Sequence, residues 1–321
     1  MMFTEENLDR YSAPLSEGED QRCKNAIGMI RDGLQSVGYS QGDRQIEKTV
    51  PDSPTYSLKM LSSHCDRSVY LFVQGSYANN TNVKTESDVD IAVVLESAFR
   101  PKYRSSGQTM ANYGFSVSSD NVVMFKNDVE KALKDHFGTG VERKNKSIRV
   151  YGNSYRVDVD SVPCIRHRDY TQDFSNNETN FVGGILIHAD DGEEVVNYPE
   201  QHILKGREKN VNTGSLYKKM VRIIKKMRYL MQDSHIAAAD QASSFGLESL
   251  LWNVPDAWYL EYAQYQKVFA FSQLIDYLIA RQDSFSSYKE ANGIKPLCPD
   301  ASAIVVLEQF LAQLRAFFTY A

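Results

Sequence analysis

The sequence has no hydrophobic run that approaches the ~20 apolar residues needed to cross a bilayer. Its beginning, from Met1 to Arg10, is acidic and polar, which is unlike a secretory signal. Cysteine is scarce: the four residues are far apart, and no two form a Cys-x-x-Cys pair. They indicate free thiols in a reducing compartment and argue against a disulfide framework or a zinc site. We therefore expect a cytoplasmic protein with no membrane segment.

An excess of basic residues is also missing. Lysine and arginine total 36 against 41 aspartates and glutamates, which gives a net charge of −5. Proteins that bind a nucleic acid duplex usually have a basic excess or a concentrated basic face. Nucleic acid is therefore not expected as the main partner, although a local basic groove is compatible with this balance. The 321 residues, 42% of them hydrophobic, suffice for one large or two medium domains.

Strand and helix patterns mix in the first two thirds of the chain, and helical patterns dominate the last third. The predicted strands are 69–73, 88–95, 147–150 and 155–162, the last two joined by a Gly152-Asn153 turn; the predicted helices are 19–36, 120–137 with an Asp120 cap, 215–232, 243–252, 257–282 and 301–318. Residues 1–18 are expected to be loosely ordered. We expect an α+β fold, with a core lobe over 1–205, a helical lobe over 206–321 and a nucleotide cleft between them.

A pair of aspartates opens the second predicted strand. Asp88 and Asp90 are two residues apart, so in a strand both side chains point to the same face. Two adjacent carboxylates repel each other unless a cation lies between them, and hard oxygen ligands suit Mg²⁺. Taken alone, the Asp-x-Asp pattern is also compatible with a solvated strand end.

A Gly-Ser pair ends the preceding predicted strand. A glycine at such a position lets backbone N–H groups approach a phosphate, because no Cβ stands in the way. The hydroxyl of Ser76 could donate to a phosphate oxygen. The order of strand, Gly75-Ser76, polar connection and Asp-x-Asp strand favours a phosphate and metal site over an ordinary turn.

The strand predicted after residue 155 carries the third acidic element. Asp158 and Asp160 again share one face, and either could be a surface charge on an edge strand. A third carboxylate beside Asp88 and Asp90 would complete a two-metal site. In phosphoryl transfer, such metals clamp the attacking and leaving oxygens.

These motifs resemble the polymerase-beta-like nucleotidyltransferase superfamily. Within it, the chain is similar to the bacterial CD-NTases, the cGAS/DncV-like cyclic-oligonucleotide synthases. The residues that carry this resemblance are Gly75-Ser76, Asp88-x-Asp90, Asp160-Ser-Val-Pro163, Asn197 to His202, Leu216 to Arg228 and Ser243 to Pro255. The resemblance implies a nucleotidyltransferase core with a mixed β-sheet and a C-terminal helical lobe.

The resemblance also implies a role for individual residues. Asp88, Asp90 and Asp160 would be catalytic and would hold two Mg²⁺ ions, or Mn²⁺ in their place. The nucleotide-binding set would be Gln74, Gly75, Ser76, Lys225, Ser244 and Phe245, with the last two at the donor triphosphate and base. Phe245 lacks the phenol hydroxyl that a tyrosine would supply at this position.

Several of these assignments have competing interpretations. Lys225 could belong to a solvated helix face, and Phe245 could be ordinary core. The basic stripe of Lys218, Arg222 and Lys225 could instead bind an RNA backbone. Residues 166–168, Arg-His-Arg, could face an acceptor nucleotide or form a surface turn.

The expected activity is the joining of ribonucleoside triphosphates into a cyclic di- or trinucleotide second messenger, with release of pyrophosphate. The resemblance implies a role in CBASS antiphage signalling, with protein partners from such an operon. Four alternatives remain at this stage: a linear oligonucleotide synthase, nucleotidyl transfer to an RNA or protein acceptor, a metal-dependent phosphohydrolase, and a non-catalytic nucleotide-sensing module. The intact carboxylates favour an enzyme.

Overall fold

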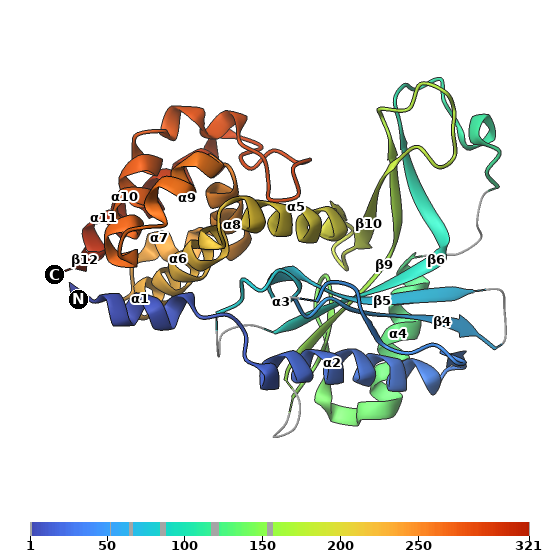
Figure 1. Ribbon diagram of the computed structural model, residues 1–321. Helices are drawn as coiled ribbons and strands as arrows, with labels where there is room; N and C mark the ends of the chain where they lie inside the picture. The colour runs from blue at the N-terminus through green and yellow to red at the C-terminus, as the bar shows by residue number, and fades with distance from the viewer. Residues whose placement is uncertain are drawn as a thin grey trace. The chain divides into compact units, whose positions relative to one another are not determined.

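The computed structural model describes residues 2–51, 53–63, 67–83, 88–116, 122–152 and 157–320. The chain divides into two compact units (Figure 1). The helical unit contains Met1–Leu15, Asn79–Ser87 and Gln201–Ala321; the sheet unit contains Ser16–Ala78 and Asp88–Glu200. The sequence analysis expected a single boundary at residue 205, with everything before it in the core lobe. By their contacts, Met1–Leu15 and Asn79–Ser87 instead group with the helical unit.

The sheet unit is built on a mixed sheet, which has ten strands within the described residues. The strands are β2 (Tyr39–Ser40), β3 (Glu47–Lys48), β4 (Tyr56–Ser62), β5 (Ser68–Gln74), β6 (Val89–Tyr103), β7 (Val141–Arg143), β8 (Ile148–Val150), β9 (Val159–Tyr170), β10 (Val182–His188) and β11 (Glu194–Asn197). Their main order is β11-β10-β9-β6-β5-β4-β2. The central β6 and β9 run parallel, and their other neighbours pair antiparallel. The expected α+β class with a mixed sheet is confirmed.

Two helices of the sheet unit, α2 (Glu17–Gln35) and α4 (Val122–Phe137), pack against each other and against the sheet, α2 along β4 and β5 and α4 along β9 (Figure 1). Ser16 and Glu19 form a capping box that starts α2. A Cβ on Gly33 would lie only 2.8 Å from the side chain of Leu133, so this glycine allows the close approach of the two helices.

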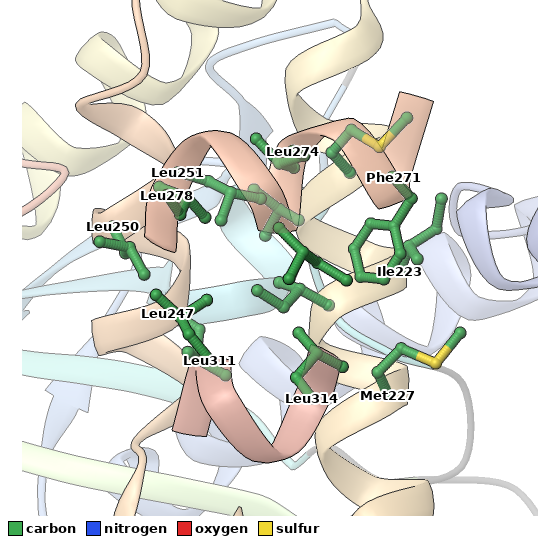
Figure 2. Packing of buried hydrophobic residues seen from close by; sticks show 14 of the residues in the cluster. Ile223, Met227, Leu247, Leu250, Leu251, Phe271, Leu274, Leu278, Leu311 and Leu314 are labelled. Carbon is green, nitrogen blue, oxygen red and sulfur yellow. The ribbon is translucent and has the colours of Figure 1, made fainter. Parts of the chain in front are cut away.

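The helical unit holds a large apolar core. Its elements are β1 (Met2–Phe3), α1 (Glu5–Ser12), most of α5 (Pro199–Asn212), α6 (Leu216–Asp233), α7 (Ala237–Gln241), α8 (Ser244–Trp252), α9 (Asp256–Tyr262), α10 (Lys267–Ile279), α11 (Ala301–Phe317) and β12 (Thr319–Tyr320). Figure 2 shows side chains of α6, α8, α10 and α11 interdigitating, among them Ile223, Leu247, Phe271 and Leu314, all fully buried. Each such side chain contributes roughly 1.5–3 kcal/mol through burial.

Three details differ from the sequence-based expectation. Residues 2–18 are ordered: a capping box at Thr4 starts α1, and Leu8 is buried in the helical core. The single helix expected over 257–282 is divided into α9 and α10. The strand expected from residue 155 begins at Val159, and residues 153–156, like the expected cap Asp120, lie outside the described residues.

Strand β6 is longer than predicted. It was expected to end at Leu95 but continues to Tyr103 beside β9, with a register irregularity between Leu95 and Phe99.

No helix in the described ranges is both long and apolar enough to cross a membrane.

Candidate functional site

Strand pairing in the centre of the sheet brings the predicted site residues together. Asp90 of β6 is the register partner of Asp160 on the parallel strand β9. On its other side, Asp90 pairs with Gln74, the last residue of β5. Asp88 directly precedes β6, two residues before Asp90. Three adjacent strands therefore bring Gln74 and the expected carboxylates to one end of their paired segments.

The two paired aspartates form a partly buried acidic centre. Burial raises the pKa of Asp90 to about 7, and the nearby charges of Asp160 and Asp88 add to this shift. Burial also raises the pKa of Asp160, with Asp88 contributing. Oδ1 of Asp160 is buried and has no hydrogen-bond partner. Partly buried carboxylates that repel each other are stabilised by a bound cation, so this pair fits a divalent metal.

Gly75 is required by the position of Asp90. Its φ of +69° lies in the left-handed region. A Cβ built on Gly75 would overlap Oδ2 of Asp90 and would lie 3.4 Å from its Cγ. Ser76 follows within the short helix α3 (Gly75–Ala78), and Gln74, Gly75 and Ser76 are all partly exposed. The predicted phosphate-binding segment thus directly adjoins the Asp90 carboxylate.

Asp88 is held by an arginine that the sequence analysis missed. Nη2 of Arg149 donates to Oδ1 of Asp88 at 2.8 Å and to Oδ2 of Asp158 at 2.7 Å. Arg149 lies on β8, where it is the register partner of Asp160. This neighbour becomes visible only once the pairing of β8 with β9 is known.

Arg149 also distinguishes Asp158, which directly precedes β9, from Asp160 within that strand. Asp158 accepts hydrogen bonds from Arg149 and from the Gly152 N–H, at 2.6 Å for the latter. Burial alone would raise the pKa of Asp158, but these two donors lower it. The charge of Asp158 is therefore compensated by hydrogen bonds, whereas Oδ1 of Asp160, two residues further on, accepts none. Within the described ranges, no group of three acidic, histidine or cysteine side chains converges as a ready metal cage, and Asp88 is paired with Arg149.

The aromatic residue expected at the donor base lies at the start of α8. The ring of Phe245 is 37% exposed, so the core interpretation of this residue is wrong. The hydroxyl of Ser243 accepts from the Gly246 N–H at 2.9 Å and thereby caps the helix. Ser244, between Ser243 and Phe245 in the sequence, is partly buried. The edge of the Phe245 ring contacts His202, with ring centroids 5.0 Å apart.

The basic stripe on α6 is not a solvated face. Arg222 is 5% exposed and Lys225 is 3% exposed. Nζ of Lys225 donates to Glu248 at 2.5 Å and to Thr81 at 3.1 Å. These buried cations cannot offer a continuous surface to an RNA backbone, so that alternative is contradicted. The same hydrogen bonds occupy the ammonium group of Lys225, which was expected to bind a triphosphate.

Residues 166–168 are not a surface turn, because they lie within β9. Arg166 pairs with Glu96 at 2.8 Å, and the guanidinium of Arg168 stacks 3.9 Å above the ring of Phe99. His167 is buried. All three residues are therefore integrated into the sheet unit.

Two protein-family models match the chain. Residues 57–137 match a nucleotidyltransferase domain, and residues 204–319 match the cGAS/DncV-like nucleotidyltransferase C-terminal helical domain. The first match contains Gly75, Asp88 and Asp90, and the second contains Lys225 and Phe245. The matches agree with the division into a sheet-containing and a helical part.

Similar proteins cover nearly the whole chain. The cyclic GMP-AMP synthase CdnE03 of Staphylococcus schleiferi is 46% identical over 321 residues, which is 100% of this chain and 98% of that protein. The solved structure of the Elizabethkingia meningoseptica CdnE cyclic dinucleotide synthase with GTP and Apcpp has a TM-score of 0.72 and 31% identity, covering 98% of each chain. The Rhodothermus marinus CdnE c-UMP-AMP synthase with Apcpp and Upnpp has a TM-score of 0.76 and 26% identity, covering 98% of this chain and 96% of that one.

Proposed function

Because the chain belongs to the cGAS/DncV-like nucleotidyltransferases and is an enzyme of the cyclic-dinucleotide-synthase type, we propose that it joins ATP and GTP into a cyclic dinucleotide with release of pyrophosphate. Two purines are proposed because the relative with 46% identity over the full length is a cyclic GMP-AMP synthase. A relative solved with GTP and an ATP analogue supports the same choice.

The metal site of this proposal consists of Asp88, Asp90 and Asp160. Nucleotidyltransferases of this family use divalent metals, and we propose two Mg²⁺ ions, with Mn²⁺ as a substitute. Bound metal would lower the pKa of the attacking sugar hydroxyl and offset charge on the phosphoryl oxygens. The desolvated Asp90 and Asp160 supply oxygen ligands on adjacent strands, and Asp88 would join them by exchanging its contact with Arg149.

The phosphate-binding part of the proposal is the turn from Gln74 to Ser76. Gly75 keeps the backbone beside the Asp90 carboxylate free of a side chain, so a triphosphate could approach both the backbone and the metal ligands. Ser76, partly exposed in the next position, would donate its hydroxyl to a phosphate oxygen. These groups position the α-phosphate for in-line attack, which is most of what a protein contributes to phosphoryl transfer.

The base-binding part consists of Ser244 and Phe245. The exposed Phe245 ring provides a flat apolar face for stacking, which is worth about 1–3 kcal/mol per base. Stacking is tolerant of sequence, so Phe245 would bind the donor without choosing its base. We do not assign a direct phosphate contact to Lys225, because its ammonium is paired with Glu248.

The observation that carries the proposal is the pairing of Asp90 with Asp160 beside Gly75. Base choice is tested by omitting one of the four ribonucleoside triphosphates at a time and separating the products by chromatography. The proposal predicts that product disappears when ATP or GTP is omitted and persists without CTP or UTP. A requirement for UTP would reject the purine pair. A requirement for added RNA or protein would indicate nucleotidyl transfer to a macromolecular acceptor.

A further inference from the structure

Three successive residues of the helical unit, Asn79, Asn80 and Thr81, are each held by a buried side chain from α5, α6 or α8. We call residues 79–83 the tethered segment. It follows α3, which begins with Gly75 and Ser76, and it precedes Asp88 by five residues in sequence. The chain passes from the sheet unit into the helical unit at this segment and returns before Asp88. The segment therefore stands in the sequence between the two elements proposed for phosphate and metal binding.

Glu248 is the centre of this anchoring. Its Oε2 accepts from the Thr81 hydroxyl at 2.8 Å and from Lys225 at 2.5 Å. Its Oε1 contacts Nε2 of His202 at 2.8 Å, and Nδ1 of His202 contacts Nδ2 of Asn79 at 3.1 Å. All five residues are at least nine-tenths buried. One carboxylate on α8 thus fixes the first and third residues of the tethered segment.

The middle residue is fixed separately. Asn80 has a φ of +52°, an uncommon conformation for a side-chain-bearing residue. Nη1 of the buried Arg222 donates to its carbonyl at 2.6 Å, and Nε of Arg222 donates to the Ser12 carbonyl at 2.7 Å. The segment is therefore held in one conformation by several contacts, although it has no regular secondary structure.

We propose that Glu248 is a positioning residue for catalysis: through Thr81 and His202 it holds the tethered segment, which stands in the sequence between the proposed phosphate-binding turn at Gly75 and the proposed metal ligand Asp88. This inference rests on the proposed function of those two elements. It also gives Lys225 a role without substrate contact, because its ammonium compensates the buried Glu248 charge and bonds Thr81. Phe245 lies on the same helix and contacts His202, so the base-stacking residue shares this support.

The test uses paired substitutions at Thr81. Thr81→Val keeps the shape but removes the hydroxyl, and Thr81→Ser restores it. We expect Thr81→Val and Glu248→Gln each to lower kcat by about 10- to 100-fold with a KM change below about threefold, since small misplacements near the reacting groups are this costly. Thr81→Ser should stay within about threefold of the wild-type kcat, and the Thr81→Val/Glu248→Gln double variant should be no worse than Glu248→Gln alone.

Lys126→Gln is the matched control for loss of a buried charge. Lys126 is 2% exposed and pairs with Asp190 at 2.9 Å in the sheet unit, outside the tethered segment. It should lower the melting temperature while leaving kcat within about threefold of wild type, because its contacts do not reach the tethered segment. If Glu248→Gln loses no more kcat than Lys126→Gln, or if Thr81→Ser falls as far as Thr81→Val, the inference is overturned.

Hydrogen exchange separates this inference from the proposed function. Peptides covering residues 75–83 should exchange faster in Glu248→Gln and Thr81→Val than in wild type or Lys126→Gln, whether or not any product forms. Absence of product from the wild-type protein with faster exchange in the variants would reject the proposed function alone. Unchanged exchange in both variants would reject the anchoring by Glu248, even in an active enzyme.

Discussion

The position that a Cβ on Gly75 would take is occupied by Oδ2 of Asp90, so the proposed phosphate-binding turn directly contacts a proposed metal ligand. The glycine also has a φ of +69°, where a Cβ costs roughly 1–2 kcal/mol. Only glycine satisfies both the positive φ and the close approach of Asp90. Gly75 directly follows Gln74, the last residue of β5 and the register partner of Asp90.

Gly75→Ala is therefore expected to reduce turnover by more than about 100-fold, because the new methyl group must displace the Asp90 carboxylate. The measurement is the rate of pyrophosphate release at saturating nucleotide. Gly138→Ala is the control, since Gly138 also has a positive φ of +59°, but no atom of the described residues beyond its chain neighbours lies within 4 Å of its Cβ position. Equal losses of activity in the two variants would show that backbone strain, not the overlap with Asp90, is responsible.

Substitutions of the four aspartates should lower turnover to different extents, according to whether each aspartate is a proposed metal ligand. Asp88→Ala and Asp90→Ala should each lower kcat by more than about 100-fold, and Asp160→Asn nearly as much, since each removes a proposed metal ligand. Asp158→Asn should be milder, because Asp158 is already occupied by Arg149 and the Gly152 N–H. Titration with Mn²⁺, followed by its electron paramagnetic resonance signal, gives a readout independent of turnover. A weaker Mn²⁺ affinity in Asp158→Asn than in Asp160→Asn would contradict the assignment.

Phe245 should affect nucleotide binding more than chemistry. Phe245→Ala removes the exposed ring and should raise KM by about 5- to 100-fold, corresponding to the loss of one stacked base. Phe245→Tyr retains the aromatic face and should remain close to wild type. The check is steady-state kinetics with ATP and GTP varied separately. A fall in kcat with unchanged KM for both nucleotides would show that the ring does not stack on substrate.

The Glu248 network should make stability depend on pH. Burial alone would raise the pKa of Glu248, but Lys225 and His202 lower it well below its ordinary value. A carboxylate with a depressed folded-state pKa stabilises the protein above its unfolded-state pKa of about 4.3, and this contribution is lost as the pH falls below that value. The melting-temperature difference between wild type and Glu248→Gln should thus be largest near pH 7 and shrink below about pH 4. A difference that stays constant from pH 7 to pH 3 would contradict the linkage.

The sequence was sufficient for those parts of the site that depend on local spacing. Asp90 was expected on a strand, and Gly75 was expected to leave space for a close approach; β6 contains Asp90, and a Cβ on Gly75 would overlap its carboxylate. The expected strand began at Asp88, whereas β6 begins at Val89. The family resemblance drawn from these motifs is confirmed by relatives that cover the whole chain. Amphipathic periodicity likewise predicted α2 and α6 to within two residues.

The sequence was insufficient where partners are distant along the chain. Lys225 has helical spacing typical of a solvated stripe, yet its partners Thr81 and Glu248 are 144 and 23 residues away. Arg149 was missed for the same reason, because its relation to Asp88 depends on how three strands pair. The N-terminal helix was missed because its apolar stripe is short, and the burial of Leu8 that stabilises it depends on the distant helical core.

The most direct test of the account is to incubate the purified protein with the four ribonucleoside triphosphates and Mg²⁺, treat the reaction with phosphatase, and analyse it by liquid chromatography and mass spectrometry. Asp88→Ala/Asp90→Ala serves as the control. The account predicts a phosphatase-resistant product with the mass of a cyclic dinucleotide, absent from the control and from reactions with excess chelator. Only linear, phosphatase-trimmed oligomers would contradict cyclisation, and equal product from the double variant would contradict the assignment of the carboxylate site.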